Sequence, residues 1–253
     1  MTASVPIPDS IHDIAPQLGN LRAYCLSWGS PDDPADDFPI FRSGLPHALL
    51  NGVARLRKRP LDEALAEARR RLDGVPGAWW VGEDSDADVA DGLRARGLEA
   101  GSTLPVMAVH LADVPDVSGP PDLVIDQVTG PAMLTEYVQA YSGPFSVPDQ
   151  ALPAVVNAEA AQTEPVRFIG RIDGRVIGTS ELFVSHGVAG IYWVSTAEQH
   201  RGRGIGAALT AAALRAGRER GLRVGTLQSS RLGQPVYRRL GFQTVSQYQL
   251  LML

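Results

Sequence analysis

Arginine and glycine alternate in one short segment, Arg201-Gly202-Arg203-Gly204-Ile205-Gly206, which lies between an apolar stretch and a helical pattern. Glycine lets a backbone curl around a ligand without interference from a Cβ atom. The start of a helix offers unpaired N–H groups and a partial positive charge. Two arginines add charge-assisted hydrogen bonds to an anion. The chemistry that this segment predicts is the binding of a pyrophosphate group.

Three classes of ligand present a pyrophosphate to such a turn. A nucleoside-triphosphate loop, G-x-x-x-x-G-K-S/T, needs a lysine and a hydroxyl residue that the segment lacks. Gly202, Gly204 and Ala207 satisfy a dinucleotide fingerprint, but that reading needs an acidic residue about 20 positions later, where residues 226–228 are Thr-Leu-Gln. It also needs further strand–helix units, for which only residues 208–253 remain. Coenzyme A is the third class.

A second motif follows the first along the chain. The segment Arg201-x-x-Gly204-x-Gly206 matches the R/Q-x-x-G-x-G/A motif of the GNAT (Gcn5-related N-acetyltransferase) superfamily, and Val236-Tyr237-Arg238-Arg239-Leu240-Gly241-Phe242 looks like its terminal Y-x-x-x-G-F signature. An apolar strand pattern, 191–196, precedes the first motif, and helix and strand patterns follow it. The chain from Val124 to Leu253 therefore resembles this superfamily. The resemblance implies an α/β (α+β) GNAT fold, a mixed, mostly antiparallel sheet flanked by helices.

The resemblance also implies a reaction and a set of site residues. The implied enzyme is an acetyl-CoA-dependent N-acetyltransferase with coenzyme A as co-substrate and no metal. Backbone groups of Val194 and Thr196, with Ser195 between them, would pair with the pantetheine arm as an added strand does. The pyrophosphate would be held by Arg201, Gly202, Arg203, Gly204, Ile205, Gly206 and Ala207. Tyr237 would donate a proton to the departing thiolate, and its structural alternative is a core tyrosine.

The implied reaction is direct attack of a neutral amine on the thioester, and its base is left open. Glu181 lies on the strand paired to the acetyl-contacting strand, beside the apolar run 182–184. It could be a base with a raised pKa, or its side chain could point to solvent on the other face. In family members the base is often a chain of waters. Weaker candidates for the base are Glu198, His186 and His200. Tyr192 could line the acceptor cleft, and its alternative role is that of a core aromatic residue. Cys25 is predicted to be a buried apolar cysteine rather than a nucleophile.

Hydrophobic periodicity and turn signals predict the elements that position these residues. In the second half we expect strands at 166–172, 176–184, 188–194, 224–228 and 242–253, with helices at 131–141, from 207 to 220, and at 235–240. Asp173-Gly174 and His186-Gly187 predict the turns of an antiparallel meander. In the first half we expect helices at 11–26, from 60–62 onward and at 88–96, and strands at 78–82 and 104–111.

A Pro-rich stretch from Val114 to Asp122 divides the chain into two nearly equal halves. Its three prolines and one glycine are typical of a linker. We therefore predict two domains, a degenerate GNAT-like domain at 1–115 and a catalytic GNAT domain at 122–253. The faint similarity of element order in the halves motivates the first assignment. An unrelated N-terminal fold, or one merged sheet, would contradict it.

Composition limits the class of partner. The formal net charge is −5, which makes nucleic acid a poor partner, although residues 198–253 carry nine arginines against two glutamates. No stretch reaches the ~18 apolar residues of a membrane helix, and no secretory signal opens the chain, so we expect a cytoplasmic protein. A monomer or homodimer acting on a small-molecule amine is expected.

An acidic opening segment bears on the acceptor. Residues 1–54 contain two arginines against six aspartates, Asp9, Asp13, Asp32, Asp33, Asp36 and Asp37. Acidic walls would attract a cationic amine, while the alternative role of such charges is simple solubility. The alternative function for the whole chain is a non-catalytic acyl-CoA-binding or sensing protein.

Overall fold

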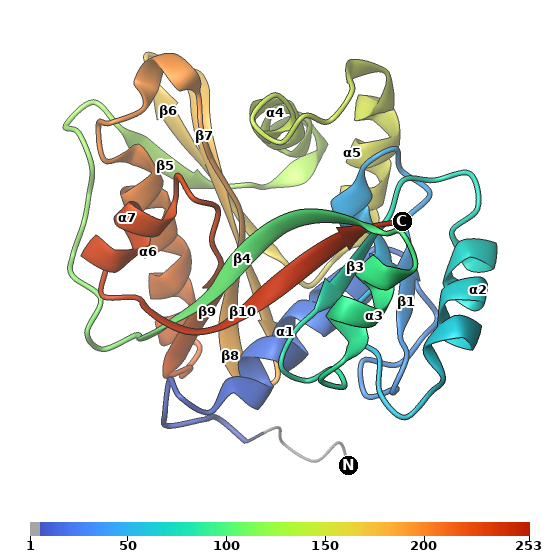
Figure 1. Ribbon diagram of the computed structural model, residues 1–253. Coiled ribbons are helices and arrows are strands. Elements are labelled where there is room, and N and C mark those ends of the chain that lie inside the picture. The colour runs from blue at the N-terminus through green and yellow to red at the C-terminus, as the bar shows by residue number, and fades with distance from the viewer. Residues whose placement is uncertain (1–5) are drawn as a thin grey trace, which may run out of the picture.

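The computed structural model describes residues 6–253 as a ten-stranded sheet with helices on both of its faces (Figure 1). The helices are α1 (Ile14–Ser27), α2 (Leu61–Arg71), α3 (Val89–Ala95), α4 (Gly130–Ser142), α5 (Leu152–Ala161), α6 (Ile205–Glu219) and α7 (Gln234–Arg239). Short 3-10 turns are η1 (Ala48–Leu50), η2 (Asp149–Ala151) and η3 (Glu198–His200). The strands are β1 (Ile40–Arg42), β2 (Asn51–Val53), β3 (Ala78–Val81), β4 (Glu99–His110), β5 (Val124–Gln127), β6 (Val166–Ile172), β7 (Arg175–Ser185), β8 (Val188–Thr196), β9 (Val224–Gln228) and β10 (Gln243–Met252).

Two tight turns build the predicted meander from β5 to β8. Asp173 and Gly174 have φ values of 49° and 75° between β6 and β7, and His186 and Gly187 have 53° and 73° between β7 and β8. Two successive positive φ angles produce the turn twist that matches antiparallel strands, which explains the Asp-Gly signal. The predicted hairpins are confirmed, with Arg167 opposite Glu181 and Glu181 opposite Tyr192.

The strands of the two halves interleave in one sheet, in the order β1-β2-β3-β10-β4-β9-β8-β7-β6-β5. Strand β4 of the first half lies between β10 and β9 of the second and pairs antiparallel with both (Figure 1). The division into separate domains at 1–115 and 122–253 is therefore wrong, because the observed arrangement is one merged sheet. By the criterion given above, the merged sheet also contradicts the assignment of residues 1–115 as a degenerate GNAT-like domain.

The Pro-rich stretch is a packed connection rather than a tether. Val114 and Val117 pack against the hydrophobic cluster beneath α6. Asp116 forms an ion pair with Arg215 of that helix. The same segment carries the chain from β4, in the middle of the sheet, to β5 at its edge, so it bridges the interleaved halves.

Four elements were not predicted. Strands β1 and β2 have three residues each, which is too short for a period to show. Strand β5 is an exposed edge strand whose sequence directly follows the prolines. Helix α5 begins with Leu-Pro, and proline at a first helical turn is compatible with a helix because its missing N–H has no intrahelical role.

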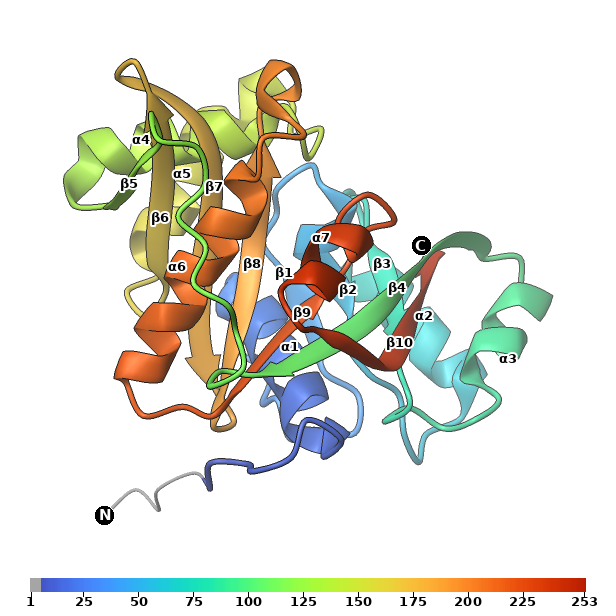
Figure 2. The same cartoon turned by 90° about the vertical axis from the view of Figure 1, so that its left-hand side faces the viewer.

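Helices divide the core into layers. Helix α6 packs against β6, β7 and β8 on one face, with α4 and α5 on the opposite side (Figure 2). Helix α1, from the first half, packs on β7 and β8 on the same side as α4. Helices α2 and α3 enclose a separate cluster around Trp79 at the far end of the sheet. Within residues 6–253, no helix is both long and apolar enough to cross a membrane.

Candidate functional site

An apolar cavity of about 210 Å³ lies where β8 and β9 separate. Residues of the first half come from α1, η1, β3 and β4, and those of the second come from β8, β9, α7 and the loop after α4. Its aromatic lining consists of Tyr24, Trp80, Phe145, Tyr192, Trp193 and Tyr237. The interleaved halves thus build one site together.

Strands β8 and β9 are parallel and pair only at Ala189–Gly225 and Gly190–Thr226. Beyond Gly190, the β9-facing edge of β8 has no strand partner among residues 6–253. Backbone N–H and C=O groups at such an edge are available to an added extended ligand. This edge contains the three predicted pantetheine-binding residues, Val194, Ser195 and Thr196, and Val194 also lines the cavity.

A bulge turns the backbone of β8 at the same place. The register between β7 and β8 shifts after Thr179–Ser195, and Trp193 has a φ of 45°, which is unusual for a bulky residue. The Thr179 hydroxyl holds this conformation by donating to the Trp193 carbonyl at 2.6 Å, and it also lies 2.7 Å from the Ser195 hydroxyl. Because the Ser195 side chain is occupied in this way, its predicted ligand contact would use the backbone.

The glycine-rich turn connects η3 to α6 on the α6 face of the sheet (Figure 2). Gly202 and Gly204 have φ values of 77° and 82°, and a Cβ added at either would meet no atom within 4 Å. The glycines therefore provide a concave backbone open to solvent. Gly204 is the N-cap of α6, so the first-turn N–H groups of Ile205, Gly206 and Ala207 have no intrahelical partner. This geometry fits an anionic pyrophosphate.

The two arginines of the turn differ in their partners. Arg203 forms a two-pronged ion pair with Asp122, at 2.9 and 3.0 Å, and lies 3.2 Å from the His200 imidazole. Arg201 is exposed and donates one hydrogen bond, at 3.4 Å, to the carbonyl of Thr196. Within residues 6–253, Arg201 has no carboxylate partner. Of the two predicted anion ligands, Arg201 is thus the better placed to supply charge.

Tyr237, in α7, reaches the cavity from the β9 side. Its ring is 8% exposed and packs against Phe242 with centroids 5.8 Å apart. Burial raises the pKa of Tyr237, so the phenol stays protonated at neutral pH and can donate a proton. Sequence analysis placed this residue by its motif, and the structure places its side chain in the same cavity as Val194.

Glu181 does not line the cavity. Its side chain is fully buried under the aromatic wall, where Arg167 lies 3.0 Å from it and Tyr137 donates a hydrogen bond at 3.3 Å. The same guanidinium donates to Glu159 at 2.7 Å, and Tyr141 donates to Glu159 at 2.8 Å. Contrary to the solvent-facing alternative, the carboxyl points inward. Contrary to the base assignment, it has no direct access to a bound amine.

One guanidinium thus serves two buried carboxyl groups. Burial and the charge of Glu159 raise the pKa of Glu181 to about 8. Burial also raises the pKa of Glu159. Glu159 receives the shorter contacts, and Glu181 keeps one carboxyl oxygen with no partner among residues 6–253. We conclude that Glu181 is the protonated member of the pair at neutral pH.

The remaining predicted candidates are distributed around the site. Tyr192 lines the cavity, stacks on Tyr24 with ring centroids 3.6 Å apart, and donates to Asn20 of α1 at 2.7 Å. Cys25 also lines it, and burial raises the pKa of its thiol, which keeps it neutral as expected of a non-nucleophile. Glu198, His186 and His200 do not contribute to the lining.

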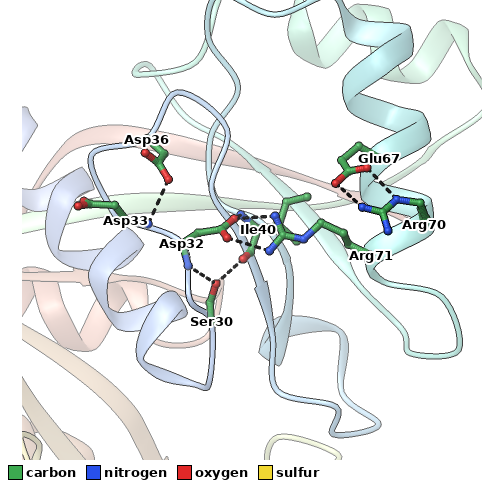
Figure 3. Close-up of polar contacts among 8 residues, drawn as sticks. All are labelled: Ser30, Asp32, Asp33, Asp36, Ile40, Glu67, Arg70 and Arg71. Carbon is green, nitrogen blue, oxygen red and sulfur yellow. Dashed lines mark hydrogen bonds and ion pairs between the residues drawn. The ribbon is translucent and has the colours of Figure 1, made fainter.

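None of the six aspartates of the acidic opening segment lines the cavity, so of the two roles considered the acidic wall does not hold for this cavity. Asp32 forms a two-pronged pair with Arg71 at 2.8 and 2.9 Å, and Asp33 and Asp36 accept backbone hydrogen bonds within their own loop (Figure 3). Asp37 pairs with Lys58 and Asp9 with Arg223. These carboxylates close the loop before β1 and tie surface elements together.

Sequence reasoning missed the contribution of the first half to the site. Leu21, Tyr24 and Cys25 are spaced along one face of α1, but only the packing of α1 on β7 and β8 brings that face to the cavity. Asn20 secures this packing by donating from its amide to the carbonyls of Phe183, Ser185 and Val188. A buried asparagine between apolar helical residues was the available signal.

Comparisons with known proteins agree with this architecture. Residues 131–242 match the acetyltransferase (GNAT) family. One similar solved structure is a GCN5-related N-acetyltransferase from Kribbella flavida, with 18% sequence identity and a TM-score of 0.70, covering 94% of this chain and 95% of that one. Another is a GCN5-related N-acetyltransferase from Sphaerobacter thermophilus, with 18% sequence identity and a TM-score of 0.65, covering 98% of this chain and 96% of that one. A tandem GNAT protein from the clavulanic acid biosynthesis pathway is also similar, with 16% sequence identity and a TM-score of 0.59, covering 85% of this chain and 78% of that one. No curated protein matches the sequence.

Proposed function

We propose that the protein transfers the acetyl group of acetyl-CoA to an amine of a small molecule, because residues 131–242 match the acetyltransferase (GNAT) family. The observation that carries the proposal is the alignment of three features at one opening of the sheet. These are the Gly202–Ala207 turn, the unpaired edge of β8 and the protonated Tyr237. Each suits a different part of an acyl thioester of coenzyme A.

In this proposal the glycine turn and Arg201 bind the pyrophosphate, and the edge of β8 pairs with the pantetheine arm. Coenzyme A supplies the thioester that reacts. The bulge at Trp193 turns backbone groups away from the β7 ladder, which lets an N–H of β8 polarise the thioester carbonyl. The Tyr237 hydroxyl then donates its proton as the thiolate departs.

The proton released by the attacking amine leaves through water in this account. Among residues 6–253, no Asp, Glu or His side chain lines the cavity. Glu181 is retained as a positioning residue, because its contacts with Arg167 and Tyr137 support the aromatic wall from behind.

The alternative is a binding or sensing protein that retains the coenzyme A site without turnover. Tyr237 favours the enzyme, since a pure binding protein does not need a proton donor at the sulfur. Release of free thiol from acetyl-CoA across a panel of amines separates the two readings. Amine-dependent release above the rate without amine supports the enzyme. Tight binding of acetyl-CoA with no release for any amine supports the sensor.

A further inference from the structure

The lining of the cavity is neutral throughout. Among residues 6–253 it includes no side chain with a formal charge. Its walls are mainly aromatic rings and the aliphatic groups of leucine, isoleucine and valine, together with Cys25, Gln228 and Ser230. Three buried or partly buried carboxyl groups outside the lining are held in ion pairs, Asp84 with Arg22, and Glu159 and Glu181 with Arg167. A ligand with a second charge inside this cavity would lose its water without gaining a partner, which is costly.

Several polar atoms of the wall have no hydrogen-bond partner among residues 6–253, including the Tyr24 hydroxyl. Trp80, Trp193 and Gln228 all line the cavity, and each has a buried side-chain nitrogen that has no hydrogen-bond partner among residues 6–253. These nitrogens are donors and cannot accept a hydrogen bond from an ammonium group. The wall therefore offers neutral dipoles but no counter-charge to an ion.

The volume of the cavity limits the size of the group that it can hold. A dry cavity of about 150 Å³ holds one benzene ring, and this cavity has a volume of about 210 Å³. Rings of Tyr24 and Tyr192, stacked on each other, form part of its wall. A single ring or a branched alkyl group of similar size fits the space.

The part of the cavity next to α1 is placed for the amine, and the part next to Val194 and Tyr237 is placed for the thioester. The glycine turn lies on the α6 face, whereas Leu21 and Cys25 reach the cavity from α1 on the opposite face of β7 and β8 (Figure 2). A thioester that enters along the edge of β8 would present its carbonyl at the opening near Tyr237. The volume beyond that point is then free for the acceptor.

We infer that the acceptor is a primary amine carried on an apolar, ring-sized group with no second charge, and that the cavity between α1 and β8 holds this group. The inference rests on the proposed function for its reaction, but its binding prediction does not require turnover. The attacking amine must be neutral, and an uncharged wall favours that form. Transfer forms an N–C bond to the acetyl group and breaks its C–S bond, and the amine proton leaves while Tyr237 protonates the sulfur.

The test compares three matched amines on the full chain, with saturating acetyl-CoA and thiol release as one readout. 2-Phenylethylamine carries the apolar ring alone, phenylalanine adds a carboxylate to the same body, and cadaverine replaces the ring by a second ammonium. We expect kcat/KM for 2-phenylethylamine to exceed that for the other two by at least about 100-fold. Calorimetric titration of each amine, with and without coenzyme A, is the readout that is independent of turnover.

Two variants test whether the preference for 2-phenylethylamine arises in the cavity. Leu49→Trp adds bulk at its half-buried rim, and Cys25→Phe fills its interior. Either should raise KM for 2-phenylethylamine about tenfold while leaving the Kd for acetyl-CoA within about twofold of wild type. Cys25→Ala is the matched control that keeps the space open. Leu49→Trp keeps the test valid if Cys25→Phe fails to fold.

The outcomes separate the two proposals. Failure of acetyl-CoA to bind overturns the proposed function, and the amine titrations still decide the cavity assignment. Tight acetyl-CoA binding together with preference for cadaverine or phenylalanine overturns the further inference alone. A preference for octanoyl-CoA over acetyl-CoA that Cys25→Phe abolishes also overturns it, because the cavity would then hold the acyl chain.

Discussion

Tyr237 is the residue on which turnover depends most directly in this account. Tyr237→Phe removes the proton donor but keeps the ring that packs on Phe242. We expect kcat for thiol release to fall about 100-fold while the Kd for acetyl-CoA changes less than about twofold. Stopped assays with the best amine measure kcat for thiol release, and calorimetry measures the Kd for acetyl-CoA. Unchanged kcat would remove Tyr237 from the mechanism.

The two arginines of the glycine turn provide an internal comparison. Arg203 is neutralised by Asp122, whereas the partner of Arg201 within the described residues 6–253 is the Thr196 carbonyl. Arg201→Ala should therefore weaken acetyl-CoA binding about tenfold, and Arg203→Ala less than about threefold. Titration of both variants in the same buffer is the measurement. A larger loss for Arg203→Ala would mean that its pair with Asp122 opens when the ligand binds.

Glu181 predicts a pH dependence of stability. Its pKa is raised from 4.5 to about 8, so the folded protein binds this proton more tightly than the unfolded chain does. The resulting stabilisation is fully present below about pH 4.5 and is lost as pH rises through about 8, with a slope of at most ~1.4 kcal/mol per pH unit. Glu181→Gln should remove this slope from denaturant unfolding curves recorded between pH 5 and 8. The exposed Glu164→Gln is the control and should retain it. An unchanged slope in Glu181→Gln would show that another group binds the proton.

At the scale of elements, the ends of α6 offer a matched pair of glycines. Gly204 precedes the helix with a φ of 82°, and Gly221 follows it with a φ of 80°, and a Cβ added at either would meet no atom within 4 Å. Alanine at either position should cost about 1 kcal/mol of unfolding free energy. Only Gly204→Ala should also weaken acetyl-CoA binding, about tenfold, because its backbone would contact the ligand. Equal binding by both variants would exclude the turn as the pyrophosphate site.

Local signals predicted most of the elements and fewer of the contacts. Asp173-Gly174 and the motif around Gly204 are short-range features, and the hairpin and turn formed as expected. The direction of Glu181 was undecided from strand alternation alone. It is set by Arg167 across the β6–β7 register and by Tyr137 on α4, and neither contact is visible as a spacing in the sequence.

The whole molecule differs from the expected pair of domains because β4 is shared. This strand supplies the partner of β9 on one side and of β10 on the other, from a position in the chain before the Pro-rich connection. A pairing between residues 114 or more positions apart in sequence, such as Met107 with Leu227, leaves no local pattern. For the same reason, the acceptor cavity could not be assigned to α1 from sequence.

This topology predicts how the chain responds to division at the Pro-rich connection. Residues 122–253 produced alone would expose the edges of both β9 and β10, and unpaired apolar edges associate. We expect the fragment to aggregate, and co-expression with residues 1–121 to restore a soluble complex. Size-exclusion chromatography distinguishes the two. A monomeric 122–253 fragment with a cooperative unfolding transition would show that β4 is dispensable.

The central claim is that coenzyme A binds at the turn between η3 and α6. Calorimetric titration of the full chain with acetyl-CoA, beside NAD as a pyrophosphate control and a Gly204→Glu variant, tests it most directly. We expect one-to-one binding of acetyl-CoA, no binding of NAD, and loss of acetyl-CoA binding in a Gly204→Glu variant that retains wild-type unfolding cooperativity. No binding by the wild type, or undiminished binding by a folded Gly204→Glu variant, would contradict it.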